Sequence, residues 1–186
     1  MLREGREPAN FGEKMVVNNY RTMVLLDEFI SSPLTPEIVL EIHRSMTSGT
    51  LDDSRDVGRI QAPGEERVSI IDIGDHSILH EPPPAEELPG RLAALCDFAN
   101  ADDDLPSVVR ASLLHFQLGH DHPFVDGNGR TARALFYWYM LRKGYPLFRY
   151  LTISRLFRES RPAYSRAYIH TELTGDLTYF LLYHTN

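Results

Sequence analysis

The chain has 186 residues, of which 42% are hydrophobic and 24% charged, so it can bury one core and has the composition of a globular domain. Its formal net charge of −7 disfavours binding to nucleic acid or to an anionic membrane surface. We recognise neither a signal peptide nor an apolar run that could span a bilayer. We therefore expect a cytoplasmic protein with no membrane partner and no nucleic acid partner through this domain.

Helical periodicity runs through most of the chain. Apolar residues at helical spacing predict an amphipathic helix over residues 11–30. Its apolar positions are Met15, Val16, Tyr20, Met23, Val24 and Phe29. Thr35 followed by Pro36 predicts the start of a second helix that ends near Met46. Further helices are predicted over residues 85–100, 105–120, 134–144, 153–160, 162–172 and 176–183. The single cysteine, Cys96, lies in an apolar run and is expected to be a buried hydrophobic residue.

One β-hairpin interrupts the helices. Strands are predicted over residues 67–73 and 77–80, and Gly74–Asp75 between them suits a hairpin turn. The sequence therefore predicts an all-α fold of seven or eight helices with one hairpin. We expect a charged N-terminal arm over residues 1–10 and a single domain over residues 11–186. Both ends are consistent with a fragment of a longer protein.

The most informative stretch is residues 122–133, which read His-Pro-Phe-Val-Asp-Gly-Asn-Gly-Arg-Thr-Ala-Arg. Gly127, Asn128 and Gly129 come just before a predicted helix, where a glycine bend can point backbone amides at an anion. Arg130 and Arg133 lie three positions apart, so they share a helix face and can grip further phosphates. The stretch therefore predicts a phosphate-binding site.

Two reactive groups lie beside that predicted phosphate site. The imidazole of His122 titrates near neutrality, so it can accept a proton from a hydroxyl group. A bound polyphosphate usually brings Mg²⁺, and Asp126 offers the carboxylate oxygen that this ion prefers. A base, a metal ligand and an anion site in one stretch indicate phosphoryl or nucleotidyl transfer.

A second interpretation starts from the histidines of the same region. The residues concerned are His115, His120, Asp121 and His122. Read alone, they could form a transition-metal cluster, or His120–Asp121 could be the dyad of a phosphohydrolase of the HD type. No matching distal set of His and Asp stands out, and metal binding would take His122 from its role as a base. We therefore favour the nucleotide site.

Residues 122–133 resemble the signature of the Fic family (filamentation induced by cAMP), His-Pro-Phe-x-Asp/Glu-Gly-Asn-Gly-Arg-x-x-Arg, and match it at every specified position. Weaker similarity extends to the hairpin, which resembles the family's flap, and to the helix that follows it. Tyr145–Pro146 and Gly175–Thr178 also resemble downstream features of the family. The resemblance implies a mostly helical fold and transfer of AMP from ATP to a Ser, Thr or Tyr hydroxyl of a target protein.

The resemblance also implies a role for each residue of the stretch. His122 would be the general base, and Asp126 would hold Mg²⁺ at the α- and β-phosphates. The backbone of residues 127–129 would cradle the phosphates. Arg130 would contact the β/γ region, and Arg133 would orient the γ-phosphate.

Two further elements acquire roles through the resemblance. The hairpin would hold a target segment by strand addition, so that its hydroxyl lies beside His122; the alternative is an ordinary edge hairpin. Its candidate target-binding residues are Ile70, Ile71, Ile73 and Ile78. Tyr164 resembles a family tyrosine near the nucleoside; the alternative is a core aromatic on one helix with Tyr168.

The chain departs from the family pattern in two places. Asp121 stands where the family usually has an apolar residue, which leaves open whether the helix end packs normally or the carboxylate tunes His122. Many members carry an inhibitory segment, Ser/Thr-x-x-x-Glu-Gly/Asn, whose Glu pairs with the second motif arginine, here Arg133. The only Glu-Gly pair, Glu4–Gly5, has no room for the preceding Ser or Thr. We expect any such segment to lie outside this chain.

Three functions stay open at this point. The first is a protein adenylyltransferase that uses ATP and Mg²⁺ and releases pyrophosphate. Within the family, the same site can instead remove AMP or use another nucleotide or phosphate donor. The third is a nucleotide-binding regulatory module with little turnover, although such a module needs the phosphate site but not His122.

Overall fold

Helices dominate this computed structural model, which describes residues 6–67, 69–71, 78–151 and 159–185. The described ranges contain seven α-helices, in agreement with the predicted all-α fold. They are α1 (Phe11–Phe29), α2 (Pro36–Thr47), α3 (Leu88–Asn100), α4 (Ser107–Asp121), α5 (Asn128–Arg142), α7 (Arg161–Thr174) and α8 (Thr178–Thr185). Short 3₁₀ turns lie at Ser54–Asp56, Ala85–Glu87 and Pro146–Arg149. Most of the helix predicted over residues 153–160 falls outside the described residues. None of the described helices combines the length and the apolar character that a membrane crossing needs.

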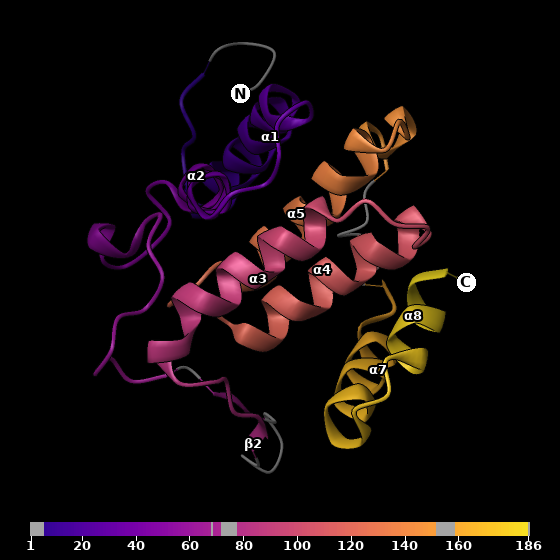
Figure 1. The fold of residues 1–186 in the computed structure, drawn as a ribbon. Helices are drawn as coiled ribbons and strands as arrows, with labels where there is room; N and C mark the ends of the chain where they lie inside the picture. Colours follow the sequence, from indigo (N-terminus) through magenta and orange to yellow (C-terminus); the bar gives the residue numbers. More distant parts are fainter. Residues whose placement is uncertain (1–5, 68, 72–77, 152–158, 186) are drawn as a thin grey trace.

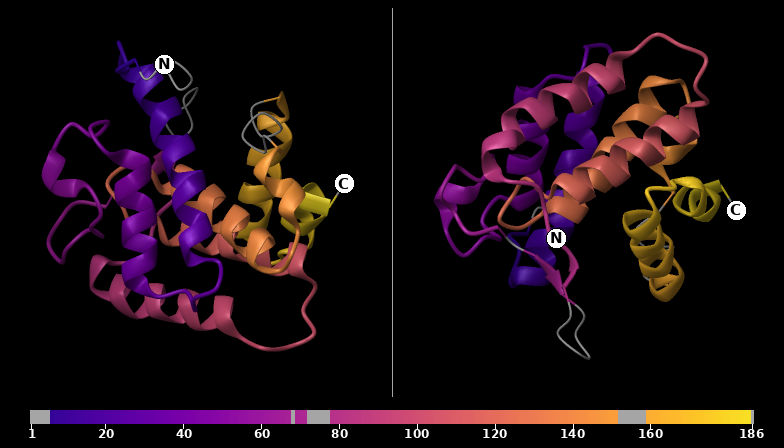
Figure 2. Two further views of the ribbon diagram at one scale, coloured as in Figure 1. Left: turned by 90° about the horizontal axis from the view of Figure 1, so that it is seen from above. Right: turned by 60° about the horizontal axis from the view of Figure 1, so that its bottom comes forward.

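The central helix of the fold is α5, which packs against α4 along its length. Every residue from Ala134 to Leu141 is buried, because α1 and α2 cover one side of the helix and α4 covers another. A helix that is apolar on all faces belongs in the interior. The α1–α2 pair lies on one side of α4 and α5, and the α7–α8 pair lies on the other (Figure 1, Figure 2). Cys96 is buried in this core, as predicted, and burial raises the pKa of its thiol to about 12.

The apolar pattern of α1 indicated its buried face only in part: Met23 and Phe29 pack against the core, but the other four apolar positions do not. Met15, Val16, Tyr20 and Val24 are exposed, and the helix instead buries Val17, Asn18, Thr22 and Leu26. The reason is that the buried face of α1 packs against α2 through hydrogen bonds between polar groups. Asn18 Nδ2 donates to the carbonyl of Ser48 at 2.8 Å, and the Thr22 hydroxyl donates to Ser45 Oγ at 2.8 Å. Apolar periodicity alone cannot reveal a face that packs through hydrogen bonds.

The two described strands of the hairpin lie near the end of α4 (Figure 2). Its described strands are β1 (Ile70–Ile71) and β2 (Ile78–His80), which pair antiparallel, with an irregularity between the two β1 residues. The predicted turn at Gly74–Asp75 lies outside the described residues. Arg67 fixes the base of the hairpin: its Nε donates to the Pro83 carbonyl at 2.9 Å, and a terminal nitrogen donates to the Asp121 carbonyl at 2.7 Å. The hairpin is therefore tied to the residues that precede the motif.

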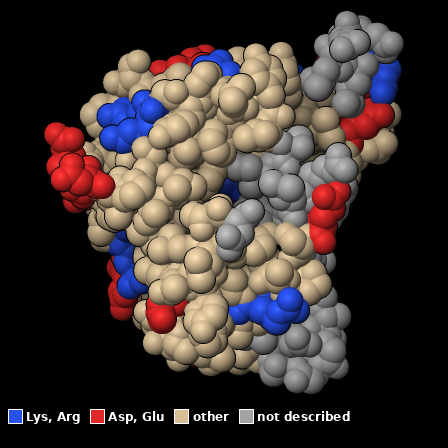
Figure 3. Space-filling view, turned by 90° about the vertical axis from the view of Figure 1, so that its right-hand side faces the viewer, with Lys and Arg blue, Asp and Glu red and all other residues tan. Residues whose placement is uncertain are grey.

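Charged side chains of both signs lie scattered over one face of the molecule. On the face that lies to the right in Figure 1, the described Lys and Arg side chains stand in small separate groups, with Asp and Glu between them (Figure 3). On the described part of this face, the Lys and Arg side chains form no continuous basic surface of the kind that binds a nucleic acid backbone.

Candidate active site

His122 ends α4 in a strained backbone conformation. Its N–H still donates to the Leu118 carbonyl at 3.0 Å, but its φ of 42° and ψ of 52° lie in the left-handed region. It is the one non-glycine residue with positive φ in the described ranges. Arg67 helps to hold this conformation, because it donates to the carbonyl of His122 itself at 3.1 Å. A conformation that costs about 1–2 kcal/mol and is held from outside is typical of functional sites.

The loop after His122 is fixed by its own side chains. The buried Asn128 closes it: Oδ1 accepts from the Phe124 N–H at 2.9 Å, and Nδ2 donates to the Phe124 carbonyl at 2.7 Å. The N–H of Gln61 donates to the Pro123 carbonyl at 2.8 Å. The side chain of Asn128 therefore shapes the loop, in addition to the backbone role predicted for it.

His43 on α2 supports the same loop, although no local sequence pattern indicated this role. Its ring stacks on Phe124, with centroids 3.8 Å apart and planes 7° apart. Its Nδ1 accepts from the Gly58 N–H at 3.0 Å, so the proton is on Nε2, which donates to the Asp126 carbonyl at 2.9 Å. Burial lowers the pKa of His43 to about 4, which keeps the ring neutral in this tautomer.

The backbone that was predicted to bind phosphate lies at the first turn of α5. The prediction that this helix begins at residue 134 was wrong by six positions, because it begins at Asn128 with Gly127 as its N-cap. The buried polar residues Asn128 and Thr131 interrupt the apolar pattern and hid the first turn. Within the described residues, the N–H groups of Asn128, Gly129 and Arg130 have no hydrogen-bond partner. Free amides at a helix N-terminus form an anion site.

The His122 ring faces the same space as that helix N-terminus. A cavity of about 190 Å³ is lined by His122, Asn128, Gly129 and Tyr164, among others. Burial lowers the pKa of His122 to about 4, and the nearby Arg67 cation acts in the same direction. The ring is therefore neutral at pH 7. Its Nδ1 is buried without a hydrogen-bond partner in the described part of the chain. A neutral imidazole beside an anion site is suited to accept a proton.

The two motif arginines differ in their surroundings. Arg130 donates to Asp126 Oδ2 at 2.7 Å and to the Thr50 hydroxyl at 3.2 Å. Arg133 has no carboxylate or hydrogen-bond partner in the described ranges, and burial lowers the pKa of its guanidinium. A half-buried cation without a counter-charge, next to free helix amides, favours binding of an anion.

Tyr164 on α7 lies between the cavity and an aromatic cluster, so it packs as the predicted core aromatic, and its place near a nucleoside stays a prediction. It lines the cavity beside His122, and its ring also packs in an aromatic cluster with Tyr168 and Phe180, at centroid distances of 6.1 Å to each. Its hydroxyl lies 3.3 Å from His115 Nε2, and burial raises the pKa of Tyr164 to about 12. Tyr164 therefore forms the wall between the cavity and the core.

The four-residue cluster considered as a metal or HD-type site is not formed. His115 contacts Tyr164, and His120 contacts Glu172. Asp121 is buried and accepts from Arg91 Nε at 2.7 Å and from Gln117 Nε2 at 2.9 Å. Successive helical positions point in different directions, so neighbours in sequence do not converge. The carboxylate of Asp121 therefore anchors the end of α4 to α3.

The structure describes the candidate target-binding residues of the hairpin only in part. Ile70 and Ile71 form β1, with Ile70 opposite His80 and Ile71 opposite Ile78. Ile78 is 63% exposed and can contact another chain. Ile73 lies outside the described residues.

The helical fold and the glycine-capped helix N-terminus together define an all-α domain with a candidate anion-binding site. The chain belongs to the Fic/DOC family, whose model matches residues 33–140, and this confirms the resemblance drawn from the motif. The protein adenylyltransferase Fic of Drosophila willistoni is 36% identical over 119 residues, which are 61% of this chain and 21% of that protein. The protein adenylyltransferase Fic of Nematostella vectensis is 32% identical over 118 residues, 62% of this chain and 25% of that protein.

Solved structures show the same fold. A Fic family protein from Desulfovibrio desulfuricans G20 matches with a TM-score of 0.81 at 24% identity, over 98% of this chain and 53% of that chain. Fic-1 (residues 134–508) from C. elegans matches with a TM-score of 0.73 at 25% identity, over 98% of this chain and 51% of that chain. The chain thus spans about half of these structures and a much smaller part of the curated relatives.

Proposed function

We propose that this domain is a protein adenylyltransferase, which transfers AMP from ATP to a Ser, Thr or Tyr hydroxyl of a target protein and releases pyrophosphate. Relatives named protein adenylyltransferase support the activity. The observation that carries the proposal is the cavity that His122 shares with the start of α5. A pure nucleotide-binding module would need the helix N-terminus but not a buried neutral imidazole beside it.

In this proposal the phosphates of ATP lie at the first turn of α5. The free amides of Asn128, Gly129 and Arg130 receive phosphate oxygens, and the positive end of the helix dipole faces them. Arg133 supplies the counter-charge for the γ-phosphate, which fits its lack of a carboxylate partner in the described ranges. Tyr164 stands on the nucleoside side of the cavity.

Asp126 fits the role of the Mg²⁺ ligand. Its side chain is 61% exposed at the entrance to α5, and its Oδ1 accepts the Gly127 N–H at 2.5 Å while Oδ2 pairs with Arg130. One carboxylate together with substrate phosphates is a common set of ligands for Mg²⁺. When bound there, the ion would neutralise charge on the α- and β-phosphates.

His122 then acts as the general base. The neutral ring accepts the proton of the target hydroxyl as its oxygen attacks the α-phosphorus. The bond from that phosphorus to the oxygen bridging to the β-phosphate breaks, and pyrophosphate leaves with its charge stabilised by Arg130 and Arg133. Strand pairing with the hairpin would hold the target segment near His122.

The test is His122→Ala, compared with His170→Ala on α7 as a control. We expect His122→Ala to fold and to bind ATP, but to label proteins of a lysate with AMP at a rate lower by a factor of about 10²–10⁴. His170→Ala should label as the unaltered chain does. Comparable labelling by His122→Ala would contradict the role of base. Parallel labelling with other nucleotides identifies the preferred donor.

A further inference from the structure

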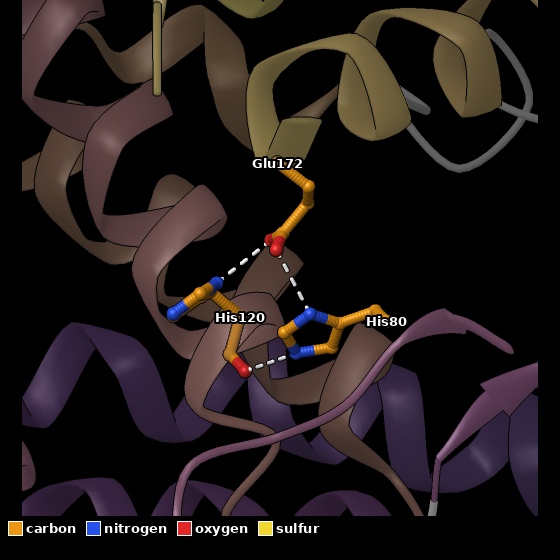
Figure 4. Close-up of side chains that lie close together, drawn as sticks. All are labelled: His80, His120 and Glu172. Carbon is orange, nitrogen blue, oxygen red and sulfur yellow. Dashed lines mark hydrogen bonds and ion pairs between the residues drawn. The ribbon is translucent and has the colours of Figure 1, made fainter. Parts of the chain in front are cut away.

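Three titratable side chains from three different elements converge beside the proposed active site (Figure 4). His80 ends β2, His120 lies in the last turn of α4, and Glu172 lies near the end of α7. His80 Nδ1 is 2.9 Å from Glu172 Oε2, and His120 Nδ1 is 2.7 Å from Glu172 Oε1. Neither His80 nor Glu172 has a part in the proposed transfer of AMP.

The orientation of the His80 ring is fixed by its second nitrogen. Nε2 lies 2.6 Å from the carbonyl oxygen of His120. A carbonyl only accepts, so Nε2 carries the proton and the neutral ring presents a lone pair at Nδ1. That lone pair faces a carboxylate oxygen, so a positive charge, either a proton or a cation, must lie between them.

We propose that His80, His120 and Glu172 bind one divalent transition-metal ion of the Zn²⁺ type. Two imidazole nitrogens and one carboxylate oxygen are ligands that such ions favour, whereas Mg²⁺ prefers oxygen alone. The ligand atoms of the three residues all lie within 4.8 Å of one another. Ligands on a tetrahedral zinc ion are roughly 3.4 Å apart, given bond lengths of about 2.1 Å. Small movements of the three side chains therefore suffice to bring their ligand atoms to these distances.

The surroundings of the three residues also suit a metal site. A ligating histidine commonly donates its other ring N–H to a backbone carbonyl, as His80 does to His120. The side chains of His80 and Glu172 are 4% and 12% exposed, and that of His120 is 31% exposed. His120 and Glu172 line a groove of about 580 Å³ that is open to solvent. The groove gives an ion a path of entry and leaves room for water as the fourth ligand.

The ion would join the hairpin to two helices. It would connect β2 to the end of α4, two residues before His122, and to α7, which carries Tyr164. Metal binding would therefore stabilise the position of the hairpin relative to the cavity. This inference does not depend on the chemistry that the cavity performs.

The test is titration of the untagged, chelator-treated chain with ZnCl₂ by calorimetry, without nucleotide. We expect one ion to bind per chain. The dissociation constant should be at least tenfold higher in both Glu172→Gln and His120→Gln. His170→Gln, a histidine on the same helix as Glu172, is the matched control and should bind as the unaltered chain does. Circular dichroism establishes that each variant is folded.

A second readout is the melting temperature with and without Zn²⁺. The ion should raise it for the unaltered chain and for His170→Gln, but not for Glu172→Gln. Absence of one-to-one binding, or unchanged binding in both ligand variants, would overturn the proposal. Neither result would affect the proposed AMP transfer, because no nucleotide is present in these measurements.

Discussion

At the scale of single residues, Gly127 and Gly129 have different tasks although they are only two positions apart. Gly127 has a φ of 87°, and a Cβ there would lie 2.6 Å from Thr47 Cγ2 and 3.1 Å from His43 Nε2. Gly129 is helical, and a Cβ there would meet only the end of the Arg133 side chain, at 3.3 Å. Gly127 is therefore required by the backbone and by packing, whereas Gly129 leaves space beside the proposed phosphates.

We expect Gly127→Ala to lower the free energy of unfolding by about 2 kcal/mol or more, because left-handed backbone strain adds to a steric clash. Gly129→Ala should leave stability unchanged or slightly higher, since alanine is the better helix former. Urea unfolding of both variants at pH 7.5 measures the difference. Equal stability of the two would mean that the motif loop is not held in the conformation described.

At the scale of secondary-structure elements, His43 connects α2 to the motif. It links Gly58 to the carbonyl of Asp126 through two hydrogen bonds, and it stacks on Phe124. The loop that carries the proposed base and metal ligand is thus positioned by a helix about 80 residues earlier in the chain. His43 is a positioning residue, because its side chain holds the loop and does not line the cavity.

The variant His43→Phe tests this connection. Phenylalanine preserves the stacking but leaves the buried Gly58 N–H and the Asp126 carbonyl without their partner. We expect a loss of about 1–3 kcal/mol in the free energy of unfolding for each unsatisfied group. Labelling with AMP should fall even where the variant is fully folded, because the loop shifts. Unchanged stability and unchanged labelling together would show that the two hydrogen bonds do not hold the loop.

The predictions from sequence succeeded where the determinants are local. Helical periodicity and the Thr35 cap identified most helices, and the cap is observed, with the Thr35 side chain accepting from the Ile38 N–H. The spacing of the motif identified the family. Periodicity failed in part at α1, and it failed at the start of α5, where buried polar residues make the packing contacts.

The interactions that complete the site could not be read from sequence, because they join distant positions. Arg67 contacts the end of α4, 54 and 55 positions away, and His80 meets Glu172 after 92 positions. No local pattern marks these residues as partners. A buried polar residue acquires its role only once the fold has placed its partner beside it.

At the scale of the whole molecule, the fold buries several histidines as neutral rings. Burial lowers the pKa of His43, His122 and His184 to about 4, and it holds the pKa of His115 well below its ordinary value. In the unfolded chain each has a pKa of about 6.5. Between pH 4 and pH 6.5 the unfolded chain therefore binds more protons than the folded one. By linkage, the contribution of these groups to stability is complete above pH 6.5 and is lost progressively as the pH falls toward 4.

We therefore expect the free energy of unfolding to decrease between pH 7.5 and pH 5 by about 1–2 kcal/mol for each of His43, His122 and His184, and His115 acts in the same direction. Carboxyl groups of the unfolded chain have a pKa near 4, and Arg55 holds the pKa of Asp53 at about 2, so such groups titrate mainly below pH 5. Urea unfolding at several pH values, with a chelator present to exclude metal, measures the slope. The slope should be smaller in His43→Phe, which lacks one of the four groups. Stability that is equal or greater at pH 5 would contradict the burial of neutral imidazoles.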